Sequence, residues 1–184
     1  WFNEFAKQVG PDNVCLLMHT DPKDPHGQDL EYIINELDIA DGRIMLSKNK
    51  IPSDLLSGMY NIAACTINIS DAEGFGLATL ESLSCETPIV VNMTGGLQEQ
   101  VTNGKDWFGI GIEPASKAVI GSQQVPYIYE DRLNKEDFID ALHKIYNMSK
   151  EERSALGKKG RAHVIKNYNF DDFEKKWVNK IDDI

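Results

Sequence analysis

Two glutamates enclose a glycine-containing stretch of this sequence. Glu73 precedes Gly74 and Gly76, and Glu81 follows with seven residues between the two acids. Glycine has no side chain, so a backbone that contains it can approach a bound group closely. Carboxylate oxygens are acceptors that suit paired hydroxyl donors such as those of a sugar. The spacing therefore predicts a site in which exposed backbone lies between two carboxylates, each of which can bind a hydroxyl-bearing group.

The elements on either side must present this stretch to a ligand. An apolar run at residues 65–69 comes before it, and an amphipathic run at residues 76–85 comes after it. The two patterns predict a strand, a short turn and a helix. The first N–H groups of a helix lack partners within the helix, and the helix dipole favours an anion beside them. We therefore expect the turn to hold a phosphate.

Apolar runs alternate with helical periodicities along the first part of the chain. Strands are predicted at residues 14–19, 43–46, 65–69 and 88–92, and helices at residues 1–9, 29–37, 55–63 and 76–85. This order is typical of a parallel, doubly wound α/β sheet, whose ligands bind beyond the carboxyl ends of its strands. Polar loops follow all four strands, at residues 19–21, 47–49, 70–76 and 92–96. We expect these loops to meet at one edge of the sheet.

The pattern changes in the second half of the chain. Residues 106–125 predict a strand and an irregular excursion, and residues 127–129 predict a last short strand. From Asn134 onward the sequence is helical, and Ser149 with Glu152 has the spacing of a capping box that starts a second helix. A third helix is predicted to begin at residues 169–171. We therefore expect extra helices after the α/β part.

Glu73-Gly74-Phe75-Gly76 with the later Glu81 resembles the signature of the group 1 family of retaining nucleotide-sugar glycosyltransferases, which have the GT-B fold. Three further segments resemble that family in the same order, at residues 59–64, 82–91 and 95–99. One glycine motif alone is weak support, whereas four linked segments are strong. The resemblance implies a Rossmann-like three-layer α/β sandwich with a parallel sheet and extra C-terminal helices.

The similarity covers residues 14–113 and is looser in the C-terminal helices. It implies that residues 1–184 are a single donor-binding domain, the C-terminal half of a two-domain GT-B enzyme whose N-terminal acceptor domain is absent. The chain begins at Trp1 rather than Met, so we expect a piece of a longer protein. In the family, the Arg and Lys residues that neutralise the diphosphate lie on a segment before this start. Departures from the family pattern, which lie outside the phosphate turn, are Ala64, Ile69 and Glu86.

The resemblance also implies a role for the residues of the signature. Glu73 and Glu81 are the candidate catalytic residues, the first holding hydroxyls of the transferred sugar and the second the ribose of the nucleotide. The backbone N–H groups of Phe75, Gly76 and Leu77 are expected to hold the diphosphate. We interpret the ring of Phe75 itself as an anchor of the turn in the core.

Five further positions belong to the implied substrate-binding site. Gly74 lies in the diphosphate-binding turn. Ser47 and Lys48 lie in the loop that contacts the nucleotide base in the family, although a plain turn after a strand explains them equally well. Gly95 and Gly96 are interpreted as necessary for a tight turn, with contact to the donor as a secondary role.

The composition excludes several classes of partner. The 184 residues carry 19 basic and 29 acidic side chains, a net charge of −10, which argues against nucleic acid because that partner requires a basic surface. No apolar run is long enough to span a membrane. The three cysteines, Cys15, Cys65 and Cys85, lack metal-ligand spacing and indicate a reduced, cytoplasmic protein. No metal site and no dedicated cofactor is expected, since the nucleotide sugar is a substrate.

We therefore expect the parent protein to be a glycosyltransferase of hexosyltransferase type, and the isolated chain to be inactive. The parent takes a sugar from a nucleoside diphosphate sugar and passes it, with retention of anomeric configuration, to a glycan, lipid or protein acceptor. The missing N-terminal domain is a further expected partner, and any peripheral membrane contact is expected through that half. Two alternatives stay open: a non-catalytic nucleotide-sugar-binding module, and a GT-B-like epimerase or phosphorylase.

Overall fold

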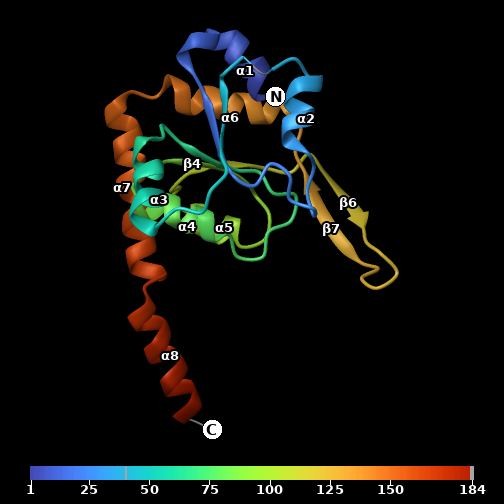
Figure 1. The fold of residues 1–184 in the computed structure, drawn as a ribbon. Coiled ribbons are helices and arrows are strands. Elements are labelled where there is room, and N and C mark those ends of the chain that lie inside the picture. Colours follow the sequence, from blue (N-terminus) through green and yellow to red (C-terminus); the bar gives the residue numbers. More distant parts are fainter. Residues whose placement is uncertain (40, 183–184) are drawn as a thin grey trace. The chain divides into compact units, whose positions relative to one another are not determined.

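The computed structural model describes residues 1–39 and 41–182 (Figure 1). The chain divides into two compact units, Trp1–Ser53 and Asp54–Ile184. Each unit contains strands that pair in parallel through helical crossovers, as the alternating sequence pattern predicts. The predicted α/β class with parallel strands and C-terminal helices is confirmed. The assignment of residues 1–184 to one donor domain stays a prediction.

The first unit contains two parallel strands joined by a helix. Its elements are α1 (Phe2–Val9), the short 3-10 helix η1 (Pro11–Asn13), β1 (Leu16–His19), α2 (Leu30–Glu36) and β2 (Ile44–Ser47). Asp29 caps α2 by accepting a hydrogen bond from the N–H of Tyr32. The parallel register places His19 opposite Ser47, so both residues lie at the carboxyl ends of their strands.

The second unit holds a three-stranded parallel sheet in the order β3-β4-β5. The elements around it are α3 (Ser53–Ile62), β3 (Thr66–Asn68), α4 (Leu77–Ser84), β4 (Ile89–Asn92), α5 (Leu97–Val101) and β5 (Ile110–Ile112). All residues of the central strand, β4, are fully buried. A parallel strand covered on both faces forms a continuous apolar run, which is why the sequence marks β4 clearly.

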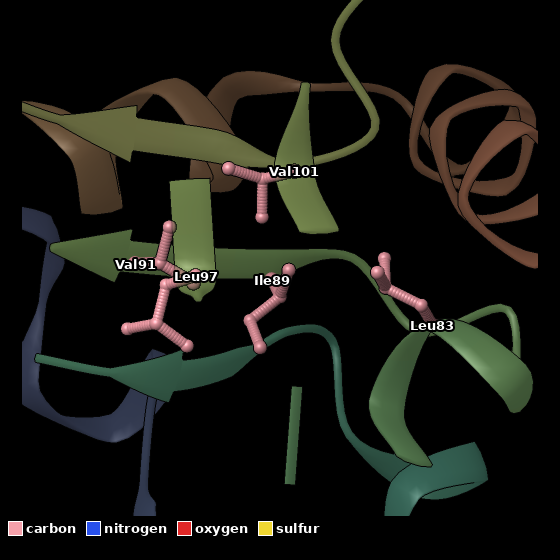
Figure 2. Packing of buried hydrophobic residues seen from close by; sticks show 5 residues of the cluster. All are labelled: Leu83, Ile89, Val91, Leu97 and Val101. Atoms are coloured by element: carbon pink, nitrogen blue, oxygen red, sulfur yellow. The ribbon is translucent and has the colours of Figure 1, made fainter. Parts of the chain in front are cut away.

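A core of buried side chains fixes α4 and α5 to this sheet (Figure 2). Its members are Leu83 from α4, Ile89 and Val91 from β4, and Leu97 and Val101 from α5, all of them fully buried. Burial of a side chain of this size contributes roughly 1.5–3 kcal/mol to stability. The turn that enters α4 is therefore attached to a well-packed scaffold.

The structure corrects the prediction for residues 106–129. β6 (Ser116–Ile120) and β7 (Ile128–Arg132) form an antiparallel hairpin, where the sequence predicted an irregular excursion and a shorter last strand. The hairpin carries exposed apolar residues on both of its faces, such as Ile120 on one and Tyr129 on the other. No alternation of apolar and polar residues therefore marks a buried side.

Helices fill residues 135–182, as predicted. They are α6 (Lys135–Asn147), α7 (Lys150–Asn167) and α8 (Phe170–Asp182). The predicted capping box is confirmed, since the N–H of Glu152 donates to Ser149 Oγ at 3.1 Å and the N–H of Ser149 donates to Glu152 Oε2 at 2.7 Å. α7 packs against α4 and α5. Among the residues that the structure describes, no helix combines the length and the apolar character that a membrane crossing requires.

Candidate functional site

The turn between β3 and α4 lies at the carboxyl end of β3. Gly76 precedes the first residue of α4 as its N-cap, with a left-handed backbone of φ 86° and ψ 61°, which glycine adopts without strain. Within residues 1–39 and 41–182, no side chain caps this helix by a hydrogen bond. The first backbone N–H groups of α4 are therefore open to an anion, which the helix dipole also favours.

A second glycine turn supports the first one. The N–H of Gly96 donates a hydrogen bond of 3.2 Å to the carbonyl oxygen of Gly74. A Cβ atom on Gly95 would lie only 1.7 Å from the carbonyl oxygen of Glu73, and one on Gly96 would lie 2.7 Å from that of Gly74. The backbones of the two turns are thus in direct contact, which requires glycine at both positions. A contact of Gly95 or Gly96 with a ligand stays a prediction.

Helix α5 fixes the turn from the side of the core. A Cβ atom on Gly76 would lie 2.5 Å from Cδ2 of Leu97, so close packing also requires this glycine. Gln100 is 1% exposed, and its Nε2 donates a hydrogen bond to the carbonyl oxygen of Phe75. Sequence reasoning missed Gln100 because an amide within a helix is unremarkable by itself. The signal that was present is its spacing of three positions from Leu97, which places both residues on one helix face.

Two amide side chains at adjacent strand ends hold the start of the turn. Asn68 Oδ1 accepts hydrogen bonds from the N–H and the hydroxyl of Ser70, at 3.3 and 3.0 Å. Asn92 is fully buried and donates from Nδ2 to the carbonyl oxygens of Ser70, at 2.9 Å, and Asp131, at 2.7 Å. The N–H of Asp131 donates to the carbonyl oxygen of Asp71 at 2.7 Å. These bonds join β3, β4 and β7 around the turn.

The acidic side chains of the site differ in their surroundings. Glu73 is half-buried within the turn, whereas Glu81 is exposed on α4. Oε2 of Glu81 accepts a hydrogen bond of 2.8 Å from the hydroxyl of Tyr60. Asp71, in the same turn, lies 3.4 Å from a guanidinium nitrogen of Arg132. The turn therefore combines open backbone donors with the carboxylates of Asp71 and Glu73. Arg132 brings positive charge beside the turn.

Comparison with known proteins identifies the family. The sequence model described as glycosyl transferases group 1 matches residues 5–163. The chain belongs to this family. A curated relative, the D-inositol 3-phosphate glycosyltransferase of Thermomonospora curvata, is 36% identical over 92 residues, which are 50% of this chain and 21% of the relative. This group 1 domain thus spans about a fifth of the length of the curated relative that it matches.

Solved structures agree on the fold of this glycosyltransferase domain. The C-terminal domain of a glycosyl transferase group 1 family protein (LpcC) from Francisella tularensis has a TM-score of 0.59 at 15% identity, over 89% of this chain and 92% of that one. HepE from Anabaena, in complex with UDP and glucose, has a TM-score of 0.69 at 13% identity, over 93% and 41% of the two chains. These likenesses show that the fold is that of the C-terminal domain of GT-B glycosyltransferases.

The ring of Phe75 is not the core anchor that the sequence predicted for this domain. It is 51% exposed and packs edge-on against Tyr168, with the ring centroids 6.2 Å apart. The turn is anchored instead by Leu97, whose side chain fills the space beside Gly76. Leu77 is also exposed. The first residues of α4 therefore face solvent, which keeps their backbone accessible to a ligand.

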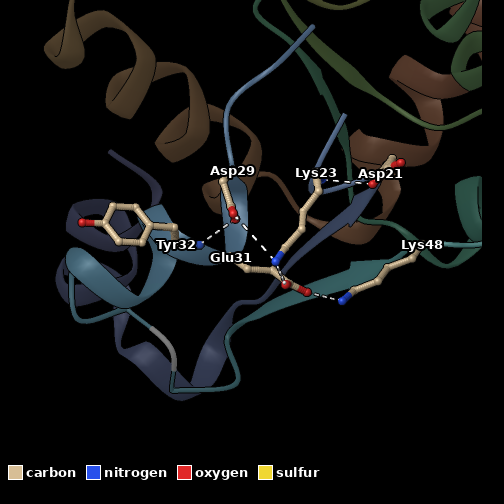
Figure 3. A network of polar contacts seen from close by, with 6 residues as sticks. All are labelled: Asp21, Lys23, Asp29, Glu31, Tyr32 and Lys48. Carbon is tan, nitrogen blue, oxygen red and sulfur yellow. Dashed lines mark hydrogen bonds and ion pairs between the residues drawn. The ribbon is translucent and has the colours of Figure 1, made fainter. Parts of the chain in front are cut away.

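The predicted base-contacting residues, Ser47 and Lys48, belong to the first unit of the glycosyltransferase domain. Ser47 Oγ lies 2.9 Å from Nδ1 of His19. Lys48 Nζ donates a hydrogen bond to Glu31, which also pairs with Lys23 at 3.5 Å (Figure 3). The Lys48 ammonium holds the pKa of the Glu31 carboxyl below its usual value. Lys48 is thus engaged by an acid, and a contact with a nucleotide base stays a prediction.

Proposed function

We propose that this domain binds the nucleoside diphosphate sugar of a glycosyltransferase, and that the parent protein transfers the sugar to an acceptor with retention of configuration. The open N-terminus of α4 carries the proposal. Among the residues that the structure describes, no side chain caps the helix that Gly76 starts. Glu73 precedes Gly76 in the turn, and Glu81 follows within the helix. A ligand with an anionic centre and hydroxyl groups on both sides fits this order of donors and acceptors. A nucleoside diphosphate sugar has that composition.

The backbone of the turn supplies the part of the site that receives the diphosphate. We assign the diphosphate to the N–H groups of Phe75, Gly76 and Leu77. An anion at a helix N-terminus gains about 0.3–1 kcal/mol at an exposed site, and up to ~2 kcal/mol when partly buried. Donors fixed in advance need no reorganisation when negative charge grows on the leaving group. The hydrogen bonds from Asn92 and Gln100 keep the turn in place for this role.

The two carboxylates orient the sugar and the nucleoside. We assign hydroxyls of the transferred sugar to Glu73 and those of the ribose to Glu81, because ionised carboxylates accept several hydrogen bonds. An oriented donor brings its anomeric carbon within reach of the acceptor hydroxyl, which lowers the barrier to transfer. HepE was solved with UDP and glucose, and the curated relative from T. curvata is named as a glycosyltransferase. The first supports a nucleoside diphosphate donor and a hexosyl group, and the second supports sugar transfer.

The test of donor binding is a titration of this chain with UDP, GDP and ADP by ligand-observed NMR. We expect one of the three nucleotides to bind, and Glu81→Ala to weaken it roughly tenfold or more, the usual effect of losing hydrogen bonds to a charged group. Glu174→Ala, on α8, is the matched control and should bind like the wild type. Equal affinities for the wild type and Glu81→Ala would contradict the assignment.

A second measurement separates a transferase from the alternatives. Sugar transfer by the full-length protein is compared with transfer by its Glu73→Ala variant at saturating donor. Turnover that is lost in the variant supports the enzyme. Nucleotide binding without turnover in either protein identifies a non-catalytic binding module. Phosphorolysis or epimerisation in place of transfer identifies the related enzyme classes.

A further inference from the structure

One acceptor of the proposed site already has a partner within the protein. The hydroxyl of Tyr60, on α3, donates a hydrogen bond of 2.8 Å to Oε2 of Glu81, on α4. This length is normal for an O–H···O bond, and an ionised acceptor strengthens the bond. In the part of the chain that the structure describes, the other oxygen, Oε1, makes no hydrogen bond or ion pair. The carboxylate is therefore held at one oxygen and open at the other.

The direction of this hydrogen bond is fixed over the physiological pH range. Tyr60 is half-buried, and burial together with the hydrogen bond to Glu81 raises the pKa of its hydroxyl well above the ordinary value. The phenol thus stays protonated across the physiological pH range. Tyr60 donates and Glu81 accepts under all conditions in which the protein is expected to bind a nucleotide.

The backbone of Tyr60 is tied to the helix that carries Glu81. Thr87 is 3% exposed and donates from its hydroxyl to the carbonyl oxygen of Tyr60 at 2.7 Å. Ser82, the neighbour of Glu81, is fully buried and donates from its hydroxyl to the carbonyl oxygen of Thr87 at 3.1 Å. Two buried side chains therefore link α3 to the end of α4. The phenol reaches Glu81 from a fixed position.

We propose that Tyr60 is a positioning residue of the nucleotide site. Its hydroxyl holds Oε2 of Glu81, so that the carboxylate presents Oε1 to the ribose hydroxyls of a nucleoside diphosphate. A free glutamate on a helix surface samples several rotamers, and ordering it on binding costs affinity. Tyr60 orders the side chain before the ligand arrives. The inference rests on the proposed function and adds to it a residue that sharpens ribose recognition without touching the ligand.

The experiment compares two dissociation constants of this chain, one for the nucleotide that binds and one for its 2′,3′-dideoxy analogue. The analogue's dissociation constant divided by that of the nucleotide measures how much the ribose hydroxyls contribute to binding. We expect Tyr60→Phe to reduce this ratio, because it weakens the binding of the nucleotide and not that of the analogue. The reduction should be roughly two- to tenfold, the usual contribution of one hydrogen bond. Glu81→Ala is expected to abolish the discrimination. Tyr60→Phe added to Glu81→Ala should then cause no further change.

The controls separate positioning from stability and from the proposed function. Tyr127→Phe removes a hydroxyl from a side chain that is 74% exposed beside β7, and should keep the wild-type ratio. A loss of stability alone would weaken the binding of the nucleotide and of the analogue equally, so it would leave the ratio unchanged. If Tyr60→Phe keeps the wild-type ratio while Glu81→Ala abolishes the discrimination, this inference is overturned. The proposal that the domain binds the donor then still stands. If the wild-type chain binds none of the nucleotides, the titration is repeated with the full-length protein, and no binding there overturns the proposed function itself.

Discussion

At the residue scale, the glycines around the turn have different tasks. Gly95 has a left-handed φ of 47°, and the space where its Cβ would lie is occupied by the carbonyl oxygen of Glu73. Gly74 is different, because a Cβ atom there would meet no atom of the described residues within 4 Å. The fold itself requires glycine at position 95. At position 74 the packing makes no such demand, and we predict that a ligand approaching the backbone is what favours glycine there.

We predict that Gly95→Ala lowers the free energy of unfolding by roughly 2–4 kcal/mol, since it adds backbone strain to a steric overlap that forces the two turns apart. Gly74→Ala should change that free energy by less than about 1 kcal/mol, yet weaken nucleotide binding. Urea unfolding and nucleotide titration of both variants measure these effects. Equal stabilities of the two variants would disprove the contact between the turns.

At the element scale, His163 connects α7 to α5. It is 8% exposed, and its ring stacks on Phe108 with the centroids 4.0 Å apart. Nε2 lies 3.1 Å from the carbonyl oxygen of Glu99, and Nδ1 lies 2.9 Å from Nδ2 of Asn167. The neutral ring satisfies both contacts by donating from Nε2 and accepting at Nδ1. A protonated ring would direct a second N–H at an amide donor.

Burial lowers the pKa of His163 from its ordinary value of 6.5. The unfolded chain therefore binds this proton more readily than the folded protein, and protons favour unfolding. We predict that the contribution of neutral His163 to the stability of the folded protein is fully present above pH 6.5. This contribution is lost as the pH falls through the pKa of His163 in the folded protein. Urea unfolding at a series of pH values measures the loss. His163→Gln, which cannot titrate, should show a flatter pH dependence, and an identical dependence would refute the role of His163.

The same scale shows what the sequence could reveal. Elements with one buried face, or with a local cap such as Ser149, have signals within a few residues, and these elements were predicted. The strands of the hairpin β6–β7 contain no buried residue in the described part of the chain, and only a short strand at residues 127–129 was predicted there. The hydrogen bonds of Asn92 and Gln100 that hold the turn join residues 22 to 39 positions apart. Such partners are brought together only by the sheet order, which no local pattern contains.

At the scale of the whole molecule, charge limits what this chain can do alone. The net charge is −10, and the turn brings its own acids, Asp71 and Glu73. Arg132 lies 3.4 Å from Asp71, so part of the positive charge of Arg132 is already balanced by this acid. The dipole of α4 offsets only a fraction of the repulsion that a diphosphate meets. We therefore expect tight binding and turnover to need further positive groups, supplied by the full-length protein.

We therefore predict that this chain binds its nucleotide weakly and transfers sugar at least ~10²-fold more slowly than the full-length protein, the usual effect of losing groups that stabilise a departing anion. The measurement compares initial rates of nucleoside diphosphate release at equal protein concentration, with acceptor present. Full-length Glu73→Ala provides the background rate. A rate for the chain alone within about tenfold of the full-length rate would contradict this prediction. It would mean that the helix dipole, Arg132 and the backbone N–H groups together are enough to stabilise the leaving diphosphate. Residues 1–184 would then hold the complete catalytic machinery.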